Sequence, residues 1–157
     1  MRVKLDRIDR QILSLLQDDA GLSNAELAEK VNLSANACWR RVKQLEESGI
    51  IRKRVALLSA EKLGLGVTVF VSIKAGSHSE EWLRKFAQGV SELPEVVEFY
   101  RLSGETDYLL KVMVRDIQDY DRVYKKLIAT APLSDVSSSF AMERIKSSTA
   151  LPLTQLW

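Results

Sequence analysis

The spacing of the hydrophobic residues changes once along the chain, near Leu63, and this change restricts the fold more than any other feature. Before Leu63 the apolar residues recur every three or four positions, as on one face of a helix. From residue 67 to residue 73 they alternate with other residues, as in a strand with one buried face. A chain of 157 residues can form two small domains. We therefore expect a helical domain over residues 1–56, a linker over 57–66 and a second domain over 67–157.

Three short helices are predicted in the first domain. After a first helix that carries Leu5, the pair Ser23 and Glu26 forms a capping box for the second helix. A brief turn then leads to Ser34, which is a good N-cap for a third helix. The apolar stripe of this third helix consists of Cys38, Val42 and Leu45. Residues 50–58 predict a strand that follows it.

The second domain is predicted to have the order β-α-β-β-α-β, which is typical of a split βαβ, or ferredoxin-like, sandwich. The expected strands are residues 67–73, 96–102, 107–114 and 136–145. The expected inner face of the second helix is Ile117, Tyr120, Tyr124 and Leu127. Both helices should cover one face of the sheet, so that the whole chain has an α+β fold. The open face should carry Phe70, Phe99, Leu109 and Met113.

Apolar residues on an open sheet face usually meet a partner, and we therefore expect a homodimer through this face. The net charge of +2 is too small to indicate indiscriminate binding to nucleic acids. Positive charge is nevertheless concentrated in residues 40–54, and a local basic surface attracts phosphates whatever the total charge.

The first domain is predicted to be a helix-turn-helix unit that binds double-stranded DNA, with its third helix in the major groove. Asparagine and arginine pair with adenine and guanine there. The expected DNA-binding residues are Ser34, Asn36, Trp39, Arg40, Arg41, Lys43, Arg52 and Arg54. Of these, Arg41, Arg52 and Arg54 are expected at phosphates, and Trp39 can stack on DNA or pack against its own domain. The alternative interpretation is a three-helix bundle with an ordinary solvated face.

Other features argue against secretion and catalysis. The single cysteine excludes an internal disulfide, and the charged N-terminus has no apolar run of the kind that a secretory signal needs. The longest uncharged stretch is far shorter than the roughly 20 residues that span a bilayer. We therefore expect a cytoplasmic protein. Because His78 is the only histidine and no phosphate loop or nucleophile elbow is present, we expect no enzyme, no cofactor and no metal site.

Several motifs together resemble one family. They are LDRIDRQILSLLQDD, LSNAELAEKVNLS, CWRRVKQLEESGII, VALLSAEKLGLG, SGETDYLLKVMVRD and SSFAMERIKSSTALPL. In this order they resemble the Lrp/AsnC, or feast/famine, transcription regulators over nearly the whole chain. One departure is Ala37, where many members of the family have proline. The resemblance implies an N-terminal DNA-binding domain and a ferredoxin-like effector domain, and a nucleoid-associated protein whose dimers assemble to octamers or other higher oligomers.

The resemblance also implies an amino-acid effector, such as cysteine, leucine or methionine, near the turn after the second strand. Backbone N–H groups around a glycine can bind the effector carboxylate, and the carboxylate of Asp107 can bind its ammonium group. The expected ligand-binding residues are Leu102, Gly104, Thr106, Asp107, Ser138, Ser139 and Phe140. From the local sequence alone, residues 103–106 are residue types that favour a hairpin turn, and they indicate no ligand site.

Two further functions remain open at this point. The same oligomer could wrap or bridge DNA without any effector, as an architectural protein. The chain could also be an enzyme or an enzyme-regulatory subunit, since ferredoxin-like folds have many functions. The absence of a catalytic constellation in the sequence argues against the second of these.

Overall fold

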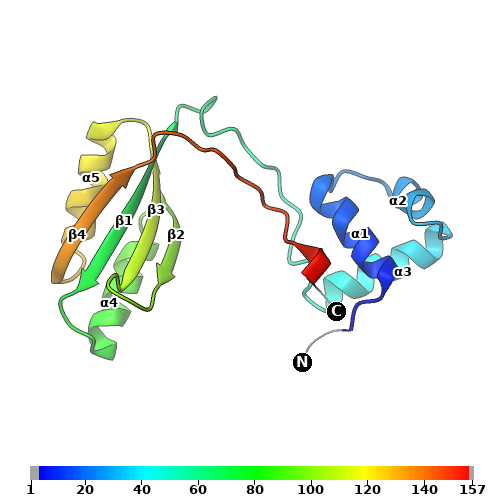
Figure 1. The fold of residues 1–157 in the computed structure, drawn as a ribbon, viewed down its shortest axis with the longest axis horizontal. Coiled ribbons are helices and arrows are strands. Elements are labelled where there is room, and N and C mark those ends of the chain that lie inside the picture. Colours follow the sequence, from blue (N-terminus) through cyan, green and yellow to red (C-terminus); the bar gives the residue numbers. More distant parts are fainter. Residues whose placement is uncertain (1–3, 156–157) are drawn as a thin grey trace. The chain divides into compact units, whose positions relative to one another are not determined.

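The computed structural model describes residues 4–155 and contains two compact units, each of which is described by itself (Figure 1). The helical unit is the chain up to Leu57 together with the segment from Lys146 onward. The sheet unit is Leu58–Ile145. The first three residues and the last two residues of the predicted domains lie outside the described part.

Each helix of the helical unit begins at a side chain that caps it. The Asp6 carboxylate accepts the N–H of Asp9, and the hydroxyl groups of Ser23 and Ser34 accept the N–H groups of Glu26 and Ala37. The two predicted serine caps are thereby confirmed. The three helices are α1 (Arg7–Asp18), α2 (Asn24–Lys30) and α3 (Ala35–Glu47).

The core of the helical unit lies between these three helices. Its buried residues are Ile12, Leu13, Leu27, Ala28, Val31, Cys38, Val42 and Leu45, which confirms the predicted stripe of α3. Gly49 follows α3 with a φ of 75°, a left-handed conformation that glycine adopts without strain. The strand predicted over residues 50–58 is wrong. Among the described residues the only sheet is formed by strands within residues 67–140, so this segment has no strand to pair with.

The segment from Lys146 onward packs against α1. The Gln17 side-chain amide donates a hydrogen bond to the Leu151 carbonyl (3.3 Å), and its oxygen accepts one from the Leu151 N–H (2.6 Å). Leu153, in the short 3-10 helix η1 (Leu153–Gln155), packs against the helical core. The predicted boundaries assigned this segment to the second domain, residues 67–157. The spacing of residues in the sequence contains no information about the packing of a C-terminal segment against an N-terminal helix.

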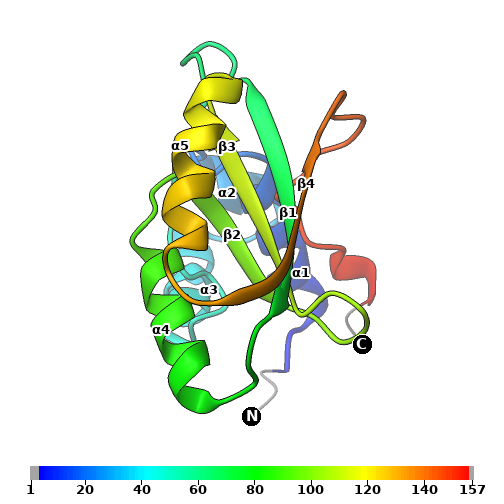
Figure 2. The ribbon, with the colours of Figure 1, turned by 90° about the vertical axis from the view of Figure 1, so that its left-hand side faces the viewer.

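The sheet unit is a four-stranded antiparallel sheet with the order β2-β3-β1-β4. Its elements are β1 (Val67–Ala75), α4 (Glu80–Ser91), β2 (Val96–Arg101), β3 (Tyr108–Val114), α5 (Ile117–Ile128) and β4 (Leu133–Phe140). Figure 2 shows α4 and α5 on the same side of the sheet. This arrangement confirms the predicted split βαβ fold.

The core of the sheet unit lies between the sheet and the two helices, and it corrects two predicted positions. Ile117 is 70% exposed because it is the first residue of α5, whereas Val123 is buried. Phe99 was expected on the open face but packs against Phe86, with ring centroids 5.6 Å apart. The register of β2 shifts by one residue before Glu98, and such a bulge reverses the faces of the residues that follow.

The fourth strand is also displaced from its predicted range of 136–145. It begins at Leu133 and ends at Phe140. Its pairing partner β1 begins at Val67, and the last ladder bond runs from the Ala141 N–H to the Thr68 carbonyl (2.9 Å). The described residues beyond this point have no neighbouring strand to pair with.

Candidate nucleic-acid interface and ligand loop

The helix α3 has one buried face and one exposed face, as its sequence pattern requires. Cys38 is fully buried, and burial raises the pKa of its thiol, which keeps the thiol protonated and unreactive at neutral pH. On the opposite face Asn36, Arg40 and Lys43 are exposed. The exposed face thus carries an amide and two cations, which are the groups that read base edges and bind phosphates in a major groove.

Trp39 lies at the edge of this exposed face. Its side chain is 47% exposed, and the Lys43 ammonium lies 5.0 Å from its ring centroid, in a cation–π contact. Trp39 and Lys43 line a surface hollow together with Arg54 and Asn24. The ring is therefore a surface group rather than part of the core, and the structure leaves it accessible for stacking.

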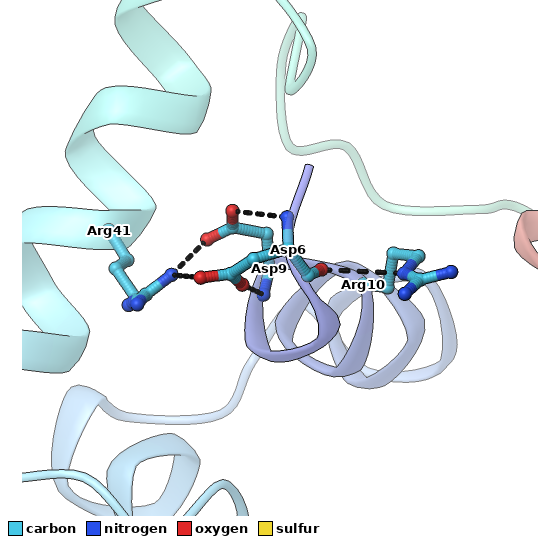
Figure 3. Close-up of polar contacts among 4 residues, drawn as sticks. All are labelled: Asp6, Asp9, Arg10 and Arg41. Carbon is cyan, nitrogen blue, oxygen red and sulfur yellow. Dashed lines mark hydrogen bonds and ion pairs between the residues drawn. The ribbon is translucent and has the colours of Figure 1, made fainter. Parts of the chain in front are cut away.

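Three cations that the sequence assigned to phosphates differ in their surroundings. Arg41 donates hydrogen bonds to the carboxylates of Asp6 and Asp9, both at 2.7 Å (Figure 3). Arg54 binds the Glu46 carboxylate at 3.2 Å and also donates to a backbone carbonyl. Arg52 is exposed. The guanidinium groups of Arg41 and Arg54 are thus engaged within the helical unit, which the sequence did not indicate.

The contacts at the N-terminus of α1 change the pKa of Asp6, the residue that caps this helix. The backbone N–H of Asp9 and the guanidinium of Arg41 both hold the pKa of Asp6 below its ordinary value. The hydrogen bonds that Arg41 donates to Asp6 and Asp9 raise the pKa of Arg41. Both shifts favour the charged forms. The spacing of Asp6 and Asp9 matches a capping box and could have been found in the sequence, but no local signal points to Arg41.

We expect the helical unit to lose stability as the pH falls below about 4. Because the folded-state pKa of Asp6 is lowered, its contribution to stability is present above the unfolded-state pKa and is lost as the pH falls through the folded-state pKa. Thermal melting between pH 3 and pH 6 should show a weaker pH dependence in Asp6→Asn than in the wild type. Asp18→Asn, at the other end of α1, is the control, and an identical slope in wild type and Asp6→Asn would contradict the assignment.

The loop between β2 and β3 is closed by backbone hydrogen bonds. The Leu102 N–H donates to the Asp107 carbonyl (2.8 Å), and the Asp107 N–H donates to the Ile73 carbonyl (3.0 Å). The Asp107 carboxylate accepts the Ala75 N–H at 2.8 Å through Oδ2. Gly104 has a φ of 125° and nothing within 4 Å of the position of a Cβ atom. The loop therefore presents an exposed backbone beside a carboxylate that is held in place by one oxygen.

The structure groups only some of the predicted ligand-binding residues. Leu102, Gly104, Thr106 and Asp107 belong to the same loop. In contrast, Ser138, Ser139 and Phe140 lie on β4, and the strands β3 and β1 separate β4 from β2.

The three β4 residues also do not share a face. Ser138 is hydrogen-bonded to Tyr120 of α5, and the Phe140 ring meets the Tyr120 ring edge-on at 5.3 Å, so both face the helices. Ser139 pairs with Phe70 and faces the other way. Side chains alternate along a strand, so three consecutive residues cannot line one pocket. Within one chain, Ser138, Ser139 and Phe140 therefore do not form a single pocket with the loop.

Two absences apply to the described residues alone. Among residues 4–155, no helix is long and apolar enough to span a bilayer. In the same part of the chain, no group of three or more His, Cys, Asp or Glu side chains could hold a metal ion.

The chain matches two family models. Residues 5–52 match a winged helix-turn-helix DNA-binding model, and residues 68–151 match the Lrp/AsnC ligand binding domain. The glutamate uptake regulatory protein of Zymomonas mobilis is 57% identical over 152 residues, which cover 97% of this chain and 93% of that protein.

Solved structures agree with these matches. An AsnC family transcriptional regulator from Agrobacterium tumefaciens has a TM-score of 0.94 and 57% identity, and the match covers 98% of this chain and 100% of that one. A transcriptional regulator from Neisseria meningitidis, solved as a complex with L-Met, has a TM-score of 0.93 and 39% identity, with coverage of 98% and 100%.

Proposed function

Because the chain belongs to the Lrp/AsnC family of transcriptional regulators, with a winged helix-turn-helix DNA-binding domain and a ligand-binding domain, we propose that it is a sequence-specific regulator whose effector is an amino acid. The family consists of regulators and not of enzymes. Beyond the family assignment, we infer which residues read DNA, which class of molecule is the effector and which assembly binds it.

The exposed face of α3 is the observation that carries the proposal. Asn36 and Arg40 present an amide and a guanidinium on the side opposite the buried stripe, and Lys43 extends the basic surface. We assign base contacts to Asn36 and Arg40, and phosphate contacts to Lys43, Arg52 and the exposed start of α3 at Ser34. Trp39 stacks on the sugar–phosphate backbone. In this assignment Arg41 and Arg54 act within the protein instead.

The loop after β2 suits the main-chain groups of an amino acid. The Asp107 carboxylate is an acceptor for an ammonium group, and the backbone around Gly104 is open on the side where a carboxylate would bind. Two comparisons agree with this class of ligand, since one relative is described as a glutamate uptake regulator and one similar structure is a complex with L-Met.

A second copy of the chain would complete this site. Among the described residues of one chain, residues 103–105 of the loop are exposed, and the open face of the sheet carries Phe70, which is 38% exposed, together with Leu109 and Met113. We infer that copies pair through this face and assemble further, and that the effector shifts this assembly by its difference in affinity between the assembled states.

A screen of the common amino acids by thermal melting, with the oligomer mass measured alongside, tests the proposal. A ligand at ten times its Kd should stabilise the sheet unit by about 1.4 kcal/mol and raise its Tm visibly. We expect at least one amino acid to do so at millimolar concentration. If none does, while the protein still binds DNA, the effector-independent architectural function becomes the better explanation.

A further inference from the structure

The ion-pair cluster of Arg41 with Asp6 and Asp9 has no role in the functions proposed so far. Figure 3 shows the two carboxylates turned toward the same guanidinium nitrogen. The side chains of Arg41, Asp6 and Asp9 are 31%, 52% and 17% exposed, so the cluster is partly shielded from water. Arg41 is next in sequence to Arg40, the residue that we assign to base reading.

The acidic half of this cluster is preorganised. Asp6 uses Oδ1 to accept the Asp9 N–H and Oδ2 to accept from Arg41. Asp9 uses Oδ2 to accept the Asp6 N–H and Oδ1 to accept from Arg41. Each carboxylate is thus fixed by the capping box through one oxygen and holds Arg41 through the other. The first turn of α1 is therefore a rigid receptor for one particular side chain of α3.

This receptor also lies next to Arg40. Arg40 lines the same surface hollow as Asp6, Asp9 and Arg41. Two carboxylates without a cation between them would attract the nearest free guanidinium, since opposite charges a few ångströms apart at a protein surface interact strongly. Arg41 binds both carboxylates and offsets one of their two negative charges, which leaves Arg40 to face outward.

We propose that Arg41, held by Asp6 and Asp9, is the positioning residue of the recognition helix. It joins α3 to the first turn of α1 and keeps Arg40 directed to the base edges, and it does not itself bind phosphate. This inference rests on the proposed DNA-reading function of α3. It predicts that the acids Asp6 and Asp9 increase specific binding, although their charge alone would repel DNA.

The experiment compares Arg41→Gln, Arg41→Lys and the double variant Asp6→Asn/Asp9→Asn with the wild type. Asparagine keeps an acceptor oxygen for each bond of the capping box and removes only the charge, so α1 stays capped. The probes are a duplex that the wild type selects from a random-sequence library and a scrambled duplex of equal length. Affinity is measured at several salt concentrations, and circular dichroism checks the fold.

We expect Arg41→Gln and the Asp6→Asn/Asp9→Asn variant each to lose about tenfold in affinity for the selected duplex. Their affinity for the scrambled duplex should not fall, and the slope of log K against log salt should stay as in the wild type, because no phosphate contact is removed. Arg41→Lys should restore part of the loss, since one ammonium can still bridge the two carboxylates, although without the guanidinium geometry.

Three results would overturn the inference. The first is an equal loss on both duplexes with a salt slope smaller by about one, which would make Arg41 a phosphate contact. The second is tighter binding of both duplexes by the Asp6→Asn/Asp9→Asn variant, and the third is unchanged discrimination in every variant. A wild type that selects no sequence at all would instead contradict the proposed base reading by α3.

Discussion

Replacing Arg40 by alanine should weaken binding to the selected operator duplex by about 1–3 kcal/mol, which is roughly 5- to 150-fold in Kd. The loss should be concentrated at one base pair. The side chain is exposed on the face of α3 opposite the buried Cys38 and Val42, where a guanidinium can bind the O6 and N7 atoms of guanine together. Fluorescence anisotropy with a set of single-base operator variants measures both the loss and its position.

A matched control is available in the sheet unit. Arg84→Ala on α4 removes the same charge from an exposed helix position, and it should leave operator affinity unchanged apart from a small effect at low salt. An equal weakening of all sequences by Arg40→Ala would mean that Arg40 binds phosphate. Unaltered affinity and an unaltered footprint would remove Arg40 from the interface altogether.

Removing the charge of Asp107 should abolish most of the affinity for the amino acid found in the screen. A charge-assisted hydrogen bond to a carboxylate contributes about 1.5–3 kcal/mol, so Kd should rise roughly 10- to 150-fold. Asp107→Asn is the sharper variant, because the amide oxygen can still accept the Ala75 N–H while the negative charge is lost. Titration calorimetry gives the affinity, and operator binding without the effector should stay at the wild-type level.

Two comparisons separate a ligand role of Asp107 from a structural role. Asp107→Ala should lower Tm as well as affinity, because the Ala75 N–H loses its partner, whereas Asp107→Asn should lower affinity alone. Glu105→Gln makes the same change of charge at an exposed position of the same loop and should bind the effector normally. If Asp107→Asn and Glu105→Gln both bind as the wild type does, the ammonium group is held elsewhere.

Short-range patterns were sufficient for most of the secondary structure. The capping serines Ser23 and Ser34 depend on neighbours within a few residues, and both were predicted correctly. The alternation over β1 depends only on a period of two and was also correct. Predictions failed where the outcome depended on another element. The bulge that turns Phe99 toward the core depends on the pairing of β2 with β3, and no local sequence pattern predicts it.

The difference between what the sequence determines and what the tertiary structure determines is clearest at the candidate sites. The sequence by itself determined which face of α3 is apolar and which is charged. It also determined that a glycine-containing loop ends in Asp107. Both follow from the helix period, the strand period and the turn chemistry, which are local properties. Only the tertiary structure decided that Arg41 joins acids more than thirty residues away, and that Ser138 and Phe140 face α5 rather than the loop. Such contacts depend on how the helices and strands pack in space, and this packing cannot be inferred from the separation of residues along the chain.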